Sequence, residues 1–170
     1  MAILARGRIV ALAAVLSGLP HALASGDTAP EYQVKAAFLY NFLKFVEWPE
    51  DKGSSAWVLG IVGRDPFGNQ LEETVRGKQV NGRPILVRHF ARMAEVQACH
   101  IVFVPRAEFS PAAALSQPGV LLVGESPGFL DAGGAINFYL EANRVRFGIQ
   151  AAHAPGLRIS SQLLKLGSAH

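Results

Sequence analysis

Cysteine is nearly missing from this 170-residue sequence, in which Cys99 is the only one. A single thiol excludes an intramolecular disulfide and every paired-cysteine zinc or redox motif. HExxH and GxxxxGK[ST] are also absent, and no run of glycines fits GxGxxG. The histidines have no histidine or cysteine at a usual helical metal-ligand spacing, and on a strand Cys99 and His100 would point to opposite faces. We therefore expect no catalytic residues, no metal and no cofactor.

Long hydrophobic runs are scarce as well, and the one near the start predicts export. It covers residues 9–19, follows Arg6 and Arg8, and precedes the small-x-small sequence Ala22–Ala24. This pattern is typical of a signal peptide, and the run is shorter than the roughly 20 residues of a membrane span. We expect residues 1–24 to be a cleaved signal peptide, with an uncleaved anchor as the alternative and no membrane insertion after processing.

Excess charge is lacking once that segment is removed. The whole sequence carries a formal charge of +3 with a pI near 9.3. The segment contains two arginines and no acidic residue, so the remainder carries +1. No stripe of lysine or arginine remains, which argues against nucleic acid as a partner.

The rest of the sequence alternates strand and helix patterns, which predicts a three-layer α/β domain over residues 25–170. Its sheet is expected to be mixed but mostly parallel, and to end in an antiparallel hairpin. The strands are expected over 57–62, 84–90, 99–104, 120–123, 136–140 and 145–149, and the helices over 31–48, 69–76, 108–117 and, in two pieces, 150–166, with Ser160 or Ser161 starting the second.

The first helix carries more apolar side chains than one buried face needs. Helical periodicity puts one aromatic group on one side and an aliphatic group on the other, and Pro49 is expected to stop the helix. One interpretation is a core helix, and the other is that part of this surface contacts a second protein chain. The aromatic side contains Val34, Phe38, Phe42 and Phe45, and the aliphatic side contains Leu39, Leu43 and Val46.

Two loops follow expected parallel strands at their carboxyl ends, where ligands usually bind in open α/β sheets. One is Gly63–Pro66 and the other is Gly124–Pro127. Backbone N–H groups at these turns could bind an anion, although both loops could equally serve only to turn the chain. The candidate ligand-binding residues are Arg64, Asp65, Glu125 and Ser126.

The expected hairpin offers a candidate surface for a partner protein. Arg144 and Arg146 are two residues apart on one strand and therefore share a face. Asn137 and Tyr139 on the other strand border the same surface and add an amide and an aromatic ring, which suit protein contacts. A solvated strand face without a partner is the alternative.

Several segments of this sequence resemble the YfiR family of exported bacterial proteins. The longest are VKAAFLYNFLKFVEWP at 34–49 and GLRISSQLL at 156–164; GRDPFG at 63–68, CHIVF at 99–103 and GGAINF at 133–138 lie between them. Members of that family commonly carry several paired cysteines, whereas this sequence keeps only Cys99. We expect Cys99 to be a buried strand thiol, with an intermolecular disulfide as the alternative.

The resemblance implies a function that the residues alone do not specify. YfiR-like proteins act in the periplasm as repressors of a membrane-bound diguanylate cyclase, bind its periplasmic sensory domain, and so lower cyclic di-GMP and biofilm formation. The resemblance leaves open a homodimer as a second assembly. The alternatives from the residues are a small periplasmic solute-binding protein and a periplasmic enzyme with an unrecognised site.

Overall fold

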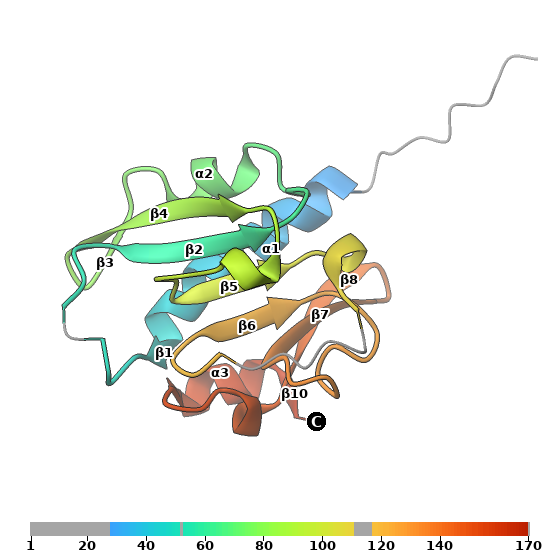
Figure 1. Cartoon of the computed structure of the whole chain (residues 1–170). Helices are drawn as coiled ribbons and strands as arrows, with labels where there is room; N and C mark the ends of the chain where they lie inside the picture. The colour runs from blue at the N-terminus through green and yellow to red at the C-terminus, as the bar shows by residue number, and fades with distance from the viewer. Residues whose placement is uncertain (1–27, 52, 111–116, 170) are drawn as a thin grey trace, which may run out of the picture.

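The computed structural model describes residues 28–51, 53–110 and 117–169. In these residues eight strands form one mixed sheet in the order β10-β8-β7-β6-β5-β2-β4-β3 (Figure 1). The short strand β1 (Val46–Glu47) pairs separately with β9 (Arg158–Ile159). Strands β4, β2, β5, β6 and β7 run parallel, and β8 returns antiparallel to β7. The predicted α/β fold, with a mostly parallel mixed sheet and an antiparallel hairpin, is confirmed. The main strands are β2 (Trp57–Val62), β4 (Arg83–Phe90), β5 (Ile101–Val104), β6 (Leu121–Gly124), β7 (Ile136–Glu141) and β8 (Arg144–Ile149).

The central strands are buried on both faces. Every residue of β2, β5 and β6 is buried, as expected for parallel strands covered on each side. One face packs against α1 (Thr28–Phe45), α2 (Gln70–Val75) and α3 (Ser161–Leu166). A second apolar cluster, which includes Val102, Leu122 and Phe129, lies on the opposite face.

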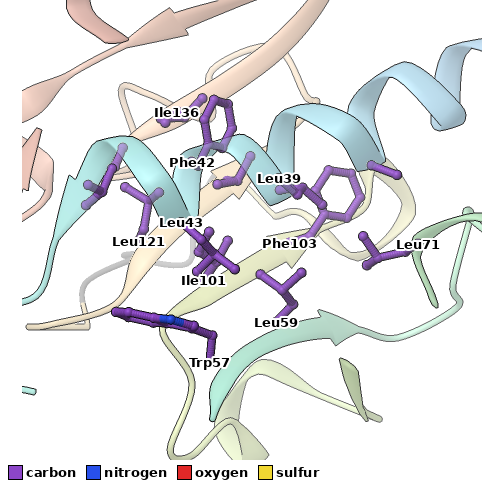
Figure 2. Close-up of a cluster of buried hydrophobic side chains, with 14 of the residues drawn as sticks. Leu39, Phe42, Leu43, Trp57, Leu59, Leu71, Ile101, Phe103, Leu121 and Ile136 are labelled. Atoms are coloured by element: carbon purple, nitrogen blue, oxygen red, sulfur yellow. The ribbon is translucent and has the colours of Figure 1, made fainter. Parts of the chain in front are cut away.

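The core beneath α1 brings together side chains from distant parts of the chain. Leu39, Phe42 and Leu43 from the helix lie over Ile101 and Leu121 from the sheet (Figure 2). Each of these side chains is at most 1% exposed. Burial of one such side chain stabilises the fold by about 1.5–3 kcal/mol. The first helix is therefore mainly a core helix.

The first helix ends earlier than its sequence predicts. It stops at Phe45 rather than at Trp48, and Val46–Glu47 forms the short strand β1. This strand pairs antiparallel with β9 (Arg158–Ile159), and the Ser160 N–H donates to the Phe45 carbonyl at 2.9 Å. Pairing with a segment more than a hundred residues away thus ends the helix before Pro49 is reached.

Some of the smaller elements differ from expectation. The first piece of the expected 150–166 helix is only a 3-10 turn, η3 (Ala151–His153), whereas α3 begins after Ser160, whose Oγ accepts the Leu163 N–H at 3.2 Å. Most of the helix expected over 108–117 lies outside the described residues. The remaining elements are β3 (Gln79–Val80), β10 (Ser168–Ala169), η1 (Met93–Glu95) and η2 (Arg106–Glu108).

Within the described part of the chain, none of the helices is both long and apolar enough to cross a bilayer.

Candidate functional site

The two loops expected to bind ligands do not meet. Arg64 and Asp65 follow β2, whereas Glu125 lies immediately after β6 and is followed by Ser126. Strand β5 lies between those two strands, so its own following segment separates the loops. The Arg64 N–H donates at 3.5 Å to Glu108 of that segment. Among the described residues, the two loops therefore lie apart rather than lining one pocket together.

Glu125 is the centre of a buried network beneath the first turns of α1. Its carboxylate accepts hydrogen bonds from the Tyr32 hydroxyl at 3.0 Å, from the Lys35 ammonium at 2.6 Å and from the Arg106 backbone N–H at 3.1 Å. The side chains of Lys35 and Glu125 are only 4% and 6% exposed, and Lys35 also pairs with Glu31. Glu125 thus ties the helix to the sheet, and internal donors already occupy its carboxylate.

Tyr32 remains a hydrogen-bond donor in this network. Burial, followed by the negative charge of Glu125, raises the pKa of its hydroxyl well above the ordinary value. The Lys35 ammonium also lies 4.5 Å from the centre of the Tyr32 ring, a cation–π contact. The phenol therefore stays protonated at physiological pH and holds the buried carboxylate in place.

The loop after β6 also contains a motif signal that sequence reasoning missed. Gly124–Gly128 spells GxSxG, the pattern of a nucleophile elbow. Ser126 is 3% exposed and its Oγ has no hydrogen-bond partner in the described residues. The strained turn of a nucleophile elbow would give the serine a positive φ, but Ser126 is not among the non-glycine residues with positive φ. Its backbone N–H instead donates to Asn137 Oδ1 at 3.0 Å, so this loop has a structural anchor rather than an activated serine.

The hairpin residues expected to bind a partner share one face. Tyr139 lies directly opposite Arg146 in the β7–β8 pair, and Asn137 and Arg144 are each two residues further along the same face. Arg144 and Arg146 are exposed, and Arg146 Nε lies 3.5 Å from Glu141 Oε2. Asn137 differs from the rest because its side chain anchors the loop after β6. Tyr139 and the two arginines therefore form the accessible part of this face.

An open groove connects this network with the hairpin. It has a volume of about 570 Å³ and lies between the start of α1 and the end of β7. Two cationic and two acidic side chains line it, so their formal charges cancel. The lining residues are Glu31, Tyr32, Lys35, Arg106, Glu125, Pro127, Asn137, Phe138, Tyr139 and Leu140.

A second, more apolar hollow of about 390 Å³ adjoins the groove and shares Glu31 and Leu140 with it. Its other lining residues include Val34, Phe38 and Arg144. Val34 is 43% exposed and Leu140 is 53% exposed, although both are large apolar side chains. We call the two hollows together the α1–hairpin surface.

A separate polar cluster surrounds His100, just before β5. His100 Nδ1 accepts the Val58 N–H at 3.0 Å, which places the proton of the neutral ring on Nε2. The Nε2 atom lies 3.3 Å from Ser54 Oγ and 3.5 Å from Asp51 Oδ2. In a catalytic triad the two partners contact different ring nitrogens, and the nitrogen facing the serine accepts its proton. This cluster therefore has the residue types of a triad without its arrangement, because both partners approach Nε2. Burial also lowers the pKa of His100.

Cys99 is buried, as predicted, but it lies just before β5 rather than within a strand, on the side of the sheet opposite to His100. Its thiol belongs to the second apolar cluster, whereas the His100 ring packs against Trp48 and Trp57 of the first. Burial raises the pKa of the Cys99 thiol to about 11. The adjacent thiol and imidazole therefore do not converge on one site.

The fold places this chain in the class of mostly parallel α/β domains with an accessible carboxyl edge. Residues 32–168 match the family model described as YfiR/HmsC-like, and the chain belongs to that family. No curated protein matches the chain. Membership of that family indicates a periplasmic regulator of diguanylate cyclases. The YfiR resemblance predicted from the sequence is thereby confirmed.

Proposed function

We propose that this protein is a periplasmic repressor that binds the sensory domain of an inner-membrane diguanylate cyclase and holds the cyclase inactive. Its activity would lower cyclic di-GMP and biofilm formation. The observation that carries this proposal is membership of the YfiR/HmsC-like family over residues 32–168. The signal peptide expected from residues 1–24 would deliver the protein to the compartment in which that sensory domain lies.

The α1–hairpin surface and the adjoining hairpin face are the surfaces we propose for the partner. Exposed Val34 and Leu140 supply apolar area, and Tyr139 with Arg144 and Arg146 supplies the residue types that most often dominate binding energy. The buried Glu125 network fixes α1 beside the hairpin, so this surface is held in place before binding. A preorganised surface loses less conformational entropy when a partner docks.

Repression requires the protein to distinguish two conformations of the cyclase. A repressor that bound the active and inactive sensory domains equally would shift nothing, however tightly it bound. Moving the cyclase from nearly all active to nearly all inactive takes a preference of about 10⁴-fold, or about 5.5 kcal/mol. That preference is within reach of a few well-packed side chains in one interface.

Measurement of cyclic di-GMP tests the proposal in the cell. Deletion of the gene should raise the nucleotide, and an exported copy should restore the lower level. A copy without residues 1–24 should fail to do so, because it stays on the wrong side of the inner membrane. The proposal would be contradicted if cyclic di-GMP stayed unchanged in the deletion strain under biofilm-forming conditions with the cyclase expressed. If the copy that is not exported restored the lower level, the protein could not be acting on the periplasmic sensory domain.

A charge reversal on the hairpin tests the surface. Arg146→Glu should weaken binding of the cyclase sensory domain at least tenfold, whereas its unfolding free energy should change by less than about 1 kcal/mol, because the side chain is 51% exposed. Arg92→Glu is the matched control. Arg92 is 80% exposed, also pairs with a nearby carboxylate, and follows β4, four strands or roughly 19 Å from β7. Equal loss of binding in both variants would show a general charge effect, and unfolding of the Arg146→Glu protein would refute the surface assignment.

A small-solute receptor is the second candidate, because the groove has a size suited to a ligand. Its volume of about 570 Å³ and its tyrosine, lysine and arginine side chains would accommodate a small polar molecule. Native mass spectrometry of the protein isolated from the periplasm would reveal such a molecule as a discrete added mass. An added mass together with unchanged cyclic di-GMP in the deletion strain would favour the receptor over the repressor.

A further inference from the structure

We propose that Asp65, Glu72 and His89 form a binding site for a divalent transition metal, with zinc as the preferred ion. His89 Nε2 lies 2.9 Å from Asp65 Oδ2 and 3.8 Å from Glu72 Oε1. The three ligand atoms all lie within 4.8 Å of one another. They come from the loop after β2, from α2 and from β4, so the site depends on three separate elements.

The backbone around Asp65 and His89 directs these two side chains to this point. Asp65 Oδ1 accepts the Phe67 N–H at 2.7 Å, which turns Oδ2 toward His89, and the Phe67 ring is buried in the core. His89 pairs with Ile61 across the parallel β2–β4 strands, and Ile61 belongs to the cluster on the helical face of the sheet. His89 therefore projects to the side on which α2 and Glu72 lie.

The spacing of the ligand atoms fits a small cation. In a tetrahedral zinc site with bonds of about 2.0–2.1 Å, neighbouring ligand atoms lie roughly 3.3 Å apart. The two distances from His89 fall on either side of that value, and the ligand atoms of Asp65 and Glu72, which lie within 4.8 Å of each other, would move closer together around an ion. An imidazole beside two carboxylates favours zinc over magnesium or calcium, which prefer oxygen ligands alone.

Three further features of the cluster suit a bound cation. Glu72 Oε2 is itself buried and has no hydrogen-bond partner in the described residues, whereas Glu72 Oε1 faces His89. Two carboxylates this close repel each other, and a cation bound between them would remove that repulsion. The His89 side chain is 47% exposed, which leaves an open side for entry of the ion and for a water as fourth ligand.

The sequence expectation of no metal considered only helical spacing between histidines and cysteines. These three ligands come from a loop, a helix and a strand, and the parallel pairing of β2 with β4 brings them together. A bound ion would cross-link those elements at the carboxyl edge of the sheet. This inference does not depend on the cyclase proposal, since it concerns a different group of residues.

Titration of zinc into the tag-free, metal-stripped protein tests the site. We expect one zinc ion per chain, a rise in the melting temperature, and a shift of the His89 ring-nitrogen resonances in a long-range ¹H–¹⁵N spectrum. His89→Gln and Asp65→Asn should each weaken binding by more than about tenfold, since even indirect partners of metal ligands cause losses of that size. Glu72→Gln should act in the same direction and disturbs the backbone least.

His153→Gln is the matched control, because it removes a histidine that bonds only the Gly134 carbonyl at 3.2 Å among the described residues. It should leave zinc affinity unchanged. Circular dichroism of each variant in chelator shows whether it folds, and Glu72→Gln serves as the test if the other two do not. Zinc that binds equally well to Glu72→Gln and wild-type protein, or no saturable zinc binding below millimolar concentration, would overturn the proposal.

Discussion

Substitution of Lys35 by methionine tests the buried network on which the α1–hairpin surface depends. The change keeps most of the side-chain length and apolar stem but removes the positive charge. Glu125 would then lie 6% exposed, without the ammonium group now 2.6 Å from its carboxylate. Removal of one partner of a buried ion pair typically costs 3–5 kcal/mol, because the remaining charge is left uncompensated. We expect the lower half of that range, since Tyr32 and the Arg106 N–H still donate to Glu125.

Chemical unfolding in urea at pH 7 measures this effect, and a double-mutant cycle assigns it. Glu125→Gln alone should also destabilise the protein, but the Lys35→Met/Glu125→Gln protein should be less destabilised than the two single changes predict together. A coupling energy of at least about 1 kcal/mol is expected for residues in direct contact within one network. Lys165→Met, an exposed change on α3, is the control and should stay within about 0.5 kcal/mol of wild type. A loss below about 1 kcal/mol for Lys35→Met, or strict additivity, would refute this account of the network.

Three other measurements follow from individual residues. Cys99, with its pKa raised to about 11 by burial, should react with iodoacetamide at pH 8 far more slowly in the native protein than in urea; equal rates would contradict its burial. Burial opposes ionisation of Asp51, but hydrogen bonds from Arg83 and Ser54 outweigh it and lower the pKa to about 2. Because the folded pKa lies below the unfolded value, Asp51→Asn should lower the unfolding free energy by about 2 kcal/mol at pH 6. The difference in unfolding free energy from wild type should vanish as the pH falls from 4 toward 2, and a difference that stays constant with pH would refute this. Intact mass of the periplasmic protein should show Ser25 as the first residue, and recovery of the full-length chain in membranes would contradict cleavage after Ala24.

Local patterns in the sequence predicted most of the framework, because each depends on neighbouring residues alone. The apolar run of β2 was predicted with its observed bounds, 57–62, and the alternation in the 136–149 hairpin gave the correct pairing of Tyr139 with the arginine face. Ser160 was also identified as a start of the last helix, since a cap acts within its own first turn. The YfiR resemblance depended on short segments of sequence and was confirmed by the family match.

The site depended on contacts that no local pattern encodes. Glu125 was expected to face a ligand, yet it is held by Lys35, a residue 90 positions away, and burial of that pair follows from the packing of α1 on the sheet. Likewise, a lysine on a helix is ordinarily solvated, and only tertiary structure buries this one.

The sequence by itself determined the order and approximate positions of the main strands and helices, because hydrophobic periodicity and capping act over a few residues. Only the tertiary structure decided which polar side chains meet. Arg64 and Glu125 were both expected in ligand-binding loops, but the strand order separates those loops. The same strand order brings Asp65 next to His89, and no sequence pattern had linked these two residues. Contacts between distant segments depend on the register and packing of the whole sheet. For that reason α1 ends at Phe45, because the next residue, Val46, pairs with Ile159, and the helix does not continue to Trp48.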